Sequence, residues 1–212
     1  MGSRLKYSTV SLLAEKINIG IIGAGKAGLI KARHFINQGV HVHILSKEES
    51  RQISELVKNN NAILEVNEYY RDFILDKHLI IIAVDDKRVA EIIRVHCNEL
   101  SKIFIDATNF KYGLAIVPIQ RETRNLVASV NLKEVNPKGA IFIADRIKRL
   151  ILEYDRFIEF TTLVRKEVKN KEKIKLSVLE FIYCEDFIFF FNKNKEKKVL
   201  ELFYGKNTIL KW

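Results

Sequence analysis

The sequence predicts an α/β protein with a doubly wound parallel sheet, followed by a smaller region of different pattern. Over the first half of the chain, short apolar runs rich in β-branched residues alternate with segments of helical periodicity. Gly23, Gly25 and Gly28 form a G-x-G-x-x-G motif directly after the first run. The fourth run, LIIIAV at 79–84, is apolar throughout, as expected of a central parallel strand covered on both faces.

The elements follow in order. The run INIGII at 17–22 ends at a glycine and predicts the first strand, and apolar spacing over 27–38 predicts a helix that stops at Gly39. We expect the remaining strands at 40–45, 62–66, 79–84 and 102–107, and the remaining helices at 50–59 and 87–100. This alternation of strand and helix is typical of a parallel sheet with helices on both faces.

The second half of the chain departs from this pattern. Residues 108–139 contain both prolines, Pro118 and Pro137, and two short apolar runs, GLAIVP and NLVASV, which predict a small strand-containing connector. A helical pattern follows over 140–169, and a charged loop over 169–175. The tail at 174–204 combines strand-favouring residues with helical spacing, and we expect helix there. The expected domains are 1–117, a connector at 118–145, and a helical domain at 146–212.

Composition and charge limit the partners. Of 212 residues, 48% are hydrophobic and 29% charged, as in an ordinary globular protein. The net charge of +10 favours an anionic partner, and nucleic acid, an acidic membrane surface and a polycarboxylate all fit that sign. The two cysteines, Cys97 and Cys184, form no metal or disulfide motif. Without a run of about 20 apolar residues or a signal-peptide pattern, we expect a soluble cytoplasmic protein.

The glycine motif predicts a dinucleotide site. The first glycine permits the tight turn, the second lets the backbone approach a pyrophosphate, and the third lets helix and strand pack closely. The helix N-terminus offers unpaired N–H groups and a partial positive charge to the phosphates. The expected cofactor contacts in the loop are Gly23, Ala24, Gly25, Lys26, Ala27 and Gly28.

The ends of the second and fourth strands carry further expected cofactor contacts. The acidic residue that normally binds the ribose at the end of the second strand is replaced by Ser46. Lys47 would favour a 2′-phosphate, whereas a following glutamate would reach the ribose hydroxyls, so NAD and NADP stay open and we favour NAD. Val84 and Asp85 are expected beside the cofactor, with the Asp85–Asp86 pair supplying a helix N-cap.

Asp106 ends the fifth strand, and ligands of open α/β sheets bind at the carboxyl ends of strands. Its carboxylate serves there either as a general base or as a cap for the following turn, and the residues alone favour the cap. His41 and His43 share one face of a strand but lack further ligands, so no metal site is predicted.

Four segments together resemble the NAD-dependent precorrin-2 dehydrogenases, the siroheme-synthase N-terminal family. GIIGAGKAGLIKARHFINQGVHVHILSKE (20–48) is similar to the family's opening, IIIAVDD (80–86) to its fourth strand, and IFIDATN (103–109) to its fifth. VPIQRE (117–122) continues the likeness. The connector departs from the family, because ASVNLKEVNPKG (128–139) replaces its Ser-Ser-Gly-Gly turn.

This resemblance implies a function. It implies oxidation of precorrin-2 to sirohydrochlorin with NAD, in siroheme or cobalamin biosynthesis, with Asp106 in the central catalytic role. It also implies a homodimer formed through the connector. Binding of the tetrapyrrole polycarboxylate would then fall to polar and basic residues of the connector and the following helix. These are Arg121, Arg124, Ser129, Lys138 and Arg146.

Other functions stay open at this point. Some relatives also insert iron into sirohydrochlorin, so a bifunctional dehydrogenase and ferrochelatase is one alternative. A non-enzymatic nucleotide-sensing regulatory domain would share the glycine loop but usually keeps the acidic residue that Ser46 replaces. Nucleic-acid binding is supported by net charge alone, so we expect neither a nucleic-acid nor a membrane partner.

Overall fold

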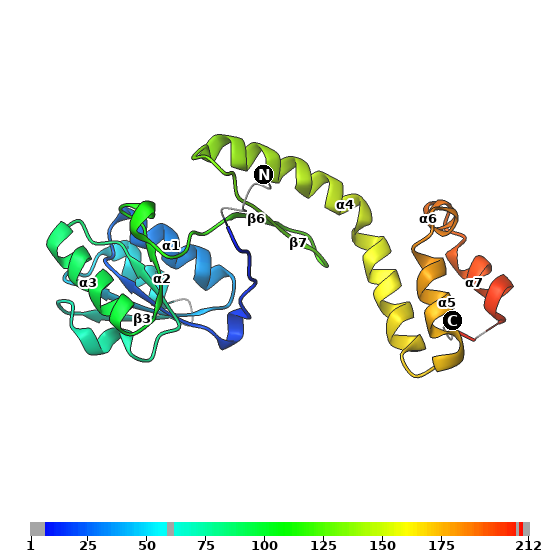
Figure 1. Ribbon diagram of the computed structural model, residues 1–212, viewed down its shortest axis with the longest axis horizontal. Helices are drawn as coiled ribbons and strands as arrows, with labels where there is room; N and C mark the ends of the chain where they lie inside the picture. The colour runs from blue at the N-terminus through cyan, green and yellow to red at the C-terminus, as the bar shows by residue number, and fades with distance from the viewer. Residues whose placement is uncertain (1–6, 59–61, 207, 210–212) are drawn as a thin grey trace, which may run out of the picture. The chain divides into compact units, whose positions relative to one another are not determined.

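The computed structural model describes residues 7–58, 62–206 and 208–209. It divides into two compact units, Met1–Val117 and Pro118–Trp212, which are described separately (Figure 1). The first unit is a five-stranded parallel sheet of order β3-β2-β1-β4-β5 with helices on its faces. The predicted fold class is therefore confirmed.

The elements of the first unit lie close to their expected positions. The strands are β1 (Asn18–Ile22), β2 (His41–Ser46), β3 (Ala62–Val66), β4 (Leu79–Ile82) and β5 (Ile103–Asp106). The α-helices are α1 (Lys26–Asn37), α2 (Arg51–Lys58) and α3 (Lys87–Glu99), and three short 3₁₀ turns are η1 (Ala14–Lys16), η2 (Arg71–Ile74) and η3 (Phe110–Tyr112). Residue 59, the expected end of α2, lies outside the described residues.

Two hydrophobic layers sandwich the sheet. Alternate residues of β4 face opposite sides, so Ile81 packs into the layer under α1 and α2, while Ile80 and Ile82 pack into the layer under α3 and η2. All four residues of β4 are buried for this reason. The chain leaves β1 toward β2 on one side and later returns to β4 on the other. The ends of β1 and β4 thus form the switch point at which ligands of such sheets bind.

The second unit begins with an antiparallel hairpin of β6 (Ile119–Glu122) and β7 (Val127–Val130). The apolar run at 113–118 forms no strand, and β6 starts only after Pro118, which has no N–H to donate to a ladder. Next comes the long helix α4 (Pro137–Val168), capped by the Asn136 side chain, which accepts a hydrogen bond from the Gly139 N–H at 2.9 Å. Helix α4 is unbroken through residue 145, where the connector was expected to end.

The tail is helical, as predicted. It forms α5 (Glu172–Ile182), α6 (Glu185–Asn192) and α7 (Glu196–Tyr204), so the expected loop at 169–175 is shorter than predicted. These helices pack against the last turns of α4 around an aromatic core that includes Phe157, Phe187 and Phe191. The strand-favouring aromatics of this stretch therefore serve helix packing, and tertiary context decides their conformation. Within the described residues, no helix has the length and apolarity needed to cross a bilayer.

Candidate functional site

Two of the three motif glycines are required by the fold itself. Gly23 has φ +102°, and a Cβ atom there would lie 2.3 Å from the carbonyl oxygen of Ala83, just after β4. A Cβ at Gly28 would lie 2.0 Å from the carbonyl oxygen of Gly23. Any side chain at either position would collide with backbone, so these glycines hold β1, α1 and the end of β4 in close contact.

Gly25 differs from both, because a Cβ there would meet no atom within 4 Å. It is the N-cap residue of α1, it makes no side-chain cap, and the first turn of the helix contains no acidic residue. Gly25, Lys26 and Ala27 are exposed, while Gly23 and Ala24 are half-buried. The positive end of α1 thus faces open space over a residue without a side chain, as a bound pyrophosphate requires.

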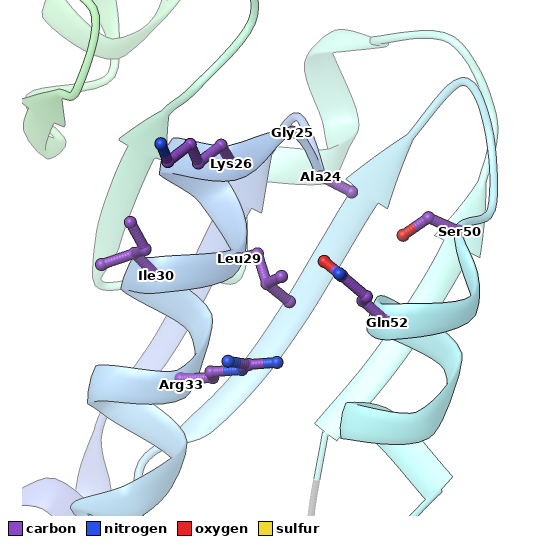
Figure 2. A pocket seen from close by; sticks show the side chains of 8 residues that line it. All are labelled: Ala24, Gly25, Lys26, Leu29, Ile30, Arg33, Ser50 and Gln52. Carbon is purple, nitrogen blue, oxygen red and sulfur yellow. The ribbon is translucent and has the colours of Figure 1, made fainter.

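An open hollow of about 580 Å³ adjoins the loop between α1 and the start of α2 (Figure 2). Two basic side chains, Lys26 and Arg33, line it together with the polar Ser50 and Gln52. Its other lining residues are Ala24, Gly25, Leu29 and Ile30. The surface next to the glycine loop is therefore concave and positively charged.

The ends of β2 and β4 flank the loop. Ser46 is half-buried, and its carbonyl accepts a hydrogen bond from the Asn67 N–H at 2.9 Å. The Nζ atom of Lys47 lies 3.1 Å from a Glu68 carboxylate oxygen, so this lysine already has an acidic neighbour. Val84 is half-buried and Asp85 exposed.

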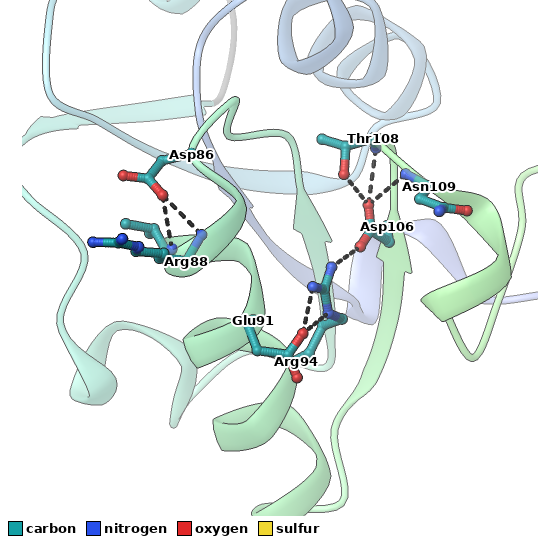
Figure 3. Close-up of polar contacts among 8 residues, drawn as sticks. Asp86, Arg88, Glu91, Arg94, Asp106, Thr108 and Asn109 are labelled. Atoms are coloured by element: carbon teal, nitrogen blue, oxygen red, sulfur yellow. Dashed lines mark hydrogen bonds and ion pairs between the residues drawn. The ribbon is translucent and has the colours of Figure 1, made fainter.

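Asp86 caps α3, as the sequence predicted for the Asp85–Asp86 pair. Its Oδ1 accepts hydrogen bonds from the backbone N–H groups of Arg88 and Val89 at 2.8 and 3.3 Å (Figure 3). These two hydrogen bonds lower the pKa of the Asp86 carboxyl. The N-cap that Asp86 provides for α3 thus fixes the conformation of the loop after β4.

Asp106 lies at the end of β5 with no exposed side-chain surface. Its Oδ1 accepts three hydrogen bonds, from the Thr108 N–H at 2.9 Å, the Thr108 hydroxyl at 2.6 Å and the Asn109 N–H at 2.8 Å (Figure 3). Its Oδ2 accepts one, from Nη1 of Arg94 at 2.6 Å. The carboxylate therefore caps the turn after β5, which is the alternative that the residues alone favoured.

The ionisation of Asp106 is set by opposing effects. Burial raises the pKa of its carboxyl, but the hydrogen bonds from Thr108, Asn109 and Arg94 outweigh burial, so the pKa lies below its ordinary value. Asp106 is a carboxylate at neutral pH. A carboxylate offers about four acceptor positions, and since Oδ1 already has three donors, Oδ2 is the oxygen with acceptor capacity left.

Arg94 was not among the predicted site residues. It lies on α3 one turn after the buried Ala90 and three residues before the buried Cys97, so the helical spacing places it toward the sheet. That spacing was the available signal, but only the structure shows which acid the guanidinium meets.

The predicted substrate-binding residues of the second unit fall into two groups. Nε of Arg121 lies 2.7 Å from Oδ1 of Asp145, and Nη1 of Arg124 lies 3.4 Å from Oε1 of Glu159, so both arginines tie the hairpin to α4. Ser129 lies on β7, opposite Gln120 of β6. The Arg146 guanidinium lies 4.7 Å from the Phe142 ring centroid, and Lys138 is exposed in the first turn of α4.

Comparison with known proteins agrees with this geometry. A family model described as "Putative NAD(P)-binding" matches residues 10–119, which is more than half of the chain. The chain belongs to this NAD(P)-binding family. The matched region spans all five strands of the parallel sheet and the turn that Asp106 caps at the end of β5.

One relative and one solved structure that resemble this NAD(P)-binding protein have names that state an activity. A protein of Methanocaldococcus jannaschii named "Putative precorrin-2 dehydrogenase" is 26% identical over 184 residues, covering 81% of this chain and 89% of the relative. The solved structure "SirC, precorrin-2 dehydrogenase" has a TM-score of 0.68 at 16% identity, covering 85% of this chain and 92% of that one. The family resemblance seen in the sequence is confirmed, and the structural match shows a shared fold.

Proposed function

We propose that this protein is a precorrin-2 dehydrogenase that oxidises precorrin-2 to sirohydrochlorin with NAD, in siroheme or cobalamin biosynthesis. The observation that carries the proposal is the open backbone at Gly25, at the N-terminus of α1, on the same sheet edge as the Asp106 carboxylate. The curated relative named for this activity aligns with most of the chain and supports the choice of substrate.

The residues that would hold the cofactor are those of the glycine loop and the neighbouring strand ends. The N–H groups of the first turn of α1 would bind the pyrophosphate, and Lys26 adds positive charge beside them. The remaining length of the dinucleotide would lie along the strand-end residues Ser46, Lys47, Val84 and Asp85. When bound, NAD supplies the acceptor for the hydride that leaves the tetrapyrrole.

We propose that Asp106 supplies the carboxylate for the proton that leaves the substrate. The reaction removes a hydride and a proton from precorrin-2, giving sirohydrochlorin, NADH and a released proton. Asp106 is ionised at neutral pH, and Oδ2 has room for one more hydrogen bond. Because the side chain is enclosed by its present partners, its access to substrate requires local movement of the turn that it caps.

The basic residues of the second unit would neutralise the substrate carboxylates. Arg146 and Lys138 have no ion pair among the interactions described in residues 7–58, 62–206 and 208–209, so they are the stronger candidates. Arg121 and Arg124 would contact substrate only while sharing their charge with Asp145 and Glu159. Ser129 would contribute a hydroxyl from β7.

The test mixes purified protein with precorrin-2 and either NAD or NADP. We expect NADH to form together with the absorption spectrum of sirohydrochlorin, faster with NAD than with NADP. Asp106→Ala should lose turnover while NAD affinity, measured by calorimetry, changes little. Turnover at the normal rate in Asp106→Ala would assign that residue to turn capping alone, and binding of NAD without turnover by the normal protein would favour a nucleotide-sensing domain.

We infer that the protein acts as a homodimer. Large apolar side chains are exposed along the hairpin and the start of α4, including Val127, Ile141 and Phe142. Apolar faces of this kind are typical of surfaces that a partner covers. Sedimentation at micromolar concentration should give twice the chain mass, and a monomer under these conditions would contradict the inference.

A further inference from the structure

The side chain of Arg94 joins three elements at the edge of the sheet. From the middle of α3, its Nη1 lies 2.6 Å from Oδ2 of Asp106 at the end of β5. Its Nε and Nη2 lie 3.2 and 2.6 Å from Oε2 of Glu91, one turn earlier on the same helix (Figure 3). Its guanidinium lies 4.7 Å from the ring centroid of Tyr112 in η3. The Arg94 side chain is only 13% exposed.

These contacts fix the orientation of the guanidinium. Glu91 holds one edge of the fork, Asp106 accepts from another N–H, and the Tyr112 ring covers a face of the plane. A planar guanidinium with several N–H donors can bond two carboxylates at different edges while an aromatic ring stacks on its face. The compact ammonium of lysine cannot make all three contacts at once. Arg94 is therefore held in one position before any ligand binds.

Asp106 depends on Arg94 at one particular oxygen. Oδ1 is taken up by Thr108 and Asn109, which belong to the turn itself. Oδ2 has Arg94 as its partner, and Oδ2 is also the atom with acceptor capacity left. Whatever Asp106 does beyond capping the turn, it does through the oxygen that Arg94 holds.

We propose that Arg94 is a positioning residue for the dehydrogenase reaction, which aims Oδ2 of Asp106 at the substrate. This proposal rests on the proposed function, in which Asp106 takes up the substrate proton. Among the interactions of the described residues, the charged partner of Asp106 is Arg94, with Glu91 behind it on the same helix α3. The turn contributes the uncharged Thr108 and Asn109, and Tyr112 of η3 packs against Arg94.

Loss of the Arg94 charge has a defined direction. The hydrogen bond from Arg94 is one of the interactions that lower the pKa of Asp106, whereas burial raises it. Without Arg94, burial is opposed by fewer partners, so the pKa of Asp106 rises and the carboxylate is protonated at higher pH. The fraction of enzyme able to accept a proton then falls on the acid side of the pH profile.

The test compares Arg94→Gln and Arg94→Lys with Arg71→Gln as the matched control. Arg71 also pairs with a glutamate of α3, with its Nη2 2.9 Å from Oε2 of Glu99, but that pair is half-exposed and does not involve Asp106. For each protein, kcat and KM are measured across the acid pH range. The titration of the Asp106 carboxyl carbon is followed separately by NMR in the absence of substrate.

We expect Arg94→Gln to lower kcat on the order of tenfold or more, because misplacement of a reacting group carries penalties of this size. The acid limb of its kcat profile and the NMR titration should both move to higher pH, with little change in NAD affinity. Arg94→Lys should show smaller shifts in the same direction, since it keeps the charge but not the fork. Arg71→Gln should match the normal protein in both measurements.

Unchanged titration of Asp106 and an unchanged pH profile in Arg94→Gln would overturn the proposal. If Arg94→Gln does not fold, Arg94→Lys decides in its place, and normal kcat with normal titration there would have the same meaning. If the normal protein shows no turnover, the proposed function fails. The NMR titration then still decides whether Arg94 controls the ionisation of Asp106.

Discussion

The glycine loop of the first unit and the basic residues of the second unit were both predicted to bind a ligand, but they are built differently. In the loop, Gly23 and Gly28 set the backbone within six positions, and the open space over Gly25 follows from local conformation. In the second unit, Arg121 meets Asp145, which lies 24 residues further along the chain. A backbone site can therefore be predicted from a short motif, whereas the availability of a charged side chain depends on distant partners.

The largest effect that would test this contrast is expected from Gly23→Ala. A Cβ at this position collides with the Ala83 carbonyl, and a non-glycine residue at φ +102° is strained. Overpacking and the left-handed conformation together should lower the free energy of unfolding by about 2–5 kcal/mol, measured by urea denaturation. A loss below about 1 kcal/mol, within ordinary surface variation, would show that the turn adapts.

The next effect concerns the turn that Asp106 caps, and the pH dependence of the stability that this carboxylate provides. Because the pKa of Asp106 is lower in the folded protein than its ordinary value, the carboxylate stabilises the fold above the unfolded pKa of about 3.9, and this stability is lost as the pH falls through the folded pKa. Asp106→Asn should therefore lower the free energy of unfolding at neutral pH by about 1–3 kcal/mol.

The same substitution should matter less in acid. The difference between Asp106→Asn and the normal protein should begin to shrink as the pH drops below about 3.9. It should be smallest below the lower folded pKa, where the carboxyl of the normal protein is also neutral. Urea denaturation at several pH values measures this difference. A difference that is constant with pH would mean that shape rather than charge determines the stabilisation by Asp106.

Gly25→Ala should separate ligand binding from folding. The backbone at Gly25 has φ −66°, which alanine adopts freely, so the free energy of unfolding should change by less than about 1 kcal/mol. The added methyl occupies the space expected for the pyrophosphate, so the Kd for NAD should rise on the order of tenfold. Calorimetry measures the Kd, and an unchanged value would place the cofactor elsewhere.

The smallest effects are expected in the second unit. Arg146→Gln should raise KM for precorrin-2 by about two- to fivefold, the range for one exposed charge contact. Arg121→Gln should leave KM within about twofold and lower the free energy of unfolding by less than about 1 kcal/mol, because its charge is shared with Asp145. Steady-state kinetics measures KM for both variants. A larger rise of KM in Arg121→Gln than in Arg146→Gln would contradict this contrast between the two arginines.

The sequence predicted the first unit well because its signals are local. Strand periods, the helix stop at Gly39 and the cap at Asp86 each depend on a few neighbouring residues. Prediction was weaker where distant contacts decide. The apolar run at 113–118 suggested a strand but forms none, and Leu114 and Ala115 instead donate backbone hydrogen bonds to the Phe104 carbonyl. The helices of the tail were expected, although their aromatic composition also suited strands.

The candidate site shows the same limit. The structure places the loop positions and Asp106 at the sheet edge, as the sequence indicated, and the capping geometry of Asp106 was one of two stated alternatives. Arg94 was missed because its role depends on meeting Asp106 across the boundary of two elements. The pairing of Arg124 with Glu159 could not be predicted either, since the sequence pattern around one residue does not indicate the other as its partner.

The near contact between Gly28 and the Gly23 carbonyl has an evolutionary consequence. Neither position can accept a larger residue, since a side chain at Gly28 collides with the Gly23 carbonyl and one at Gly23 collides with the Ala83 carbonyl. Descendants that abandoned redox chemistry should therefore retain both of them for the sake of the fold. Position 25 is under no such constraint, so the residue found there would distinguish homologues that still accommodate a dinucleotide from those that have lost it.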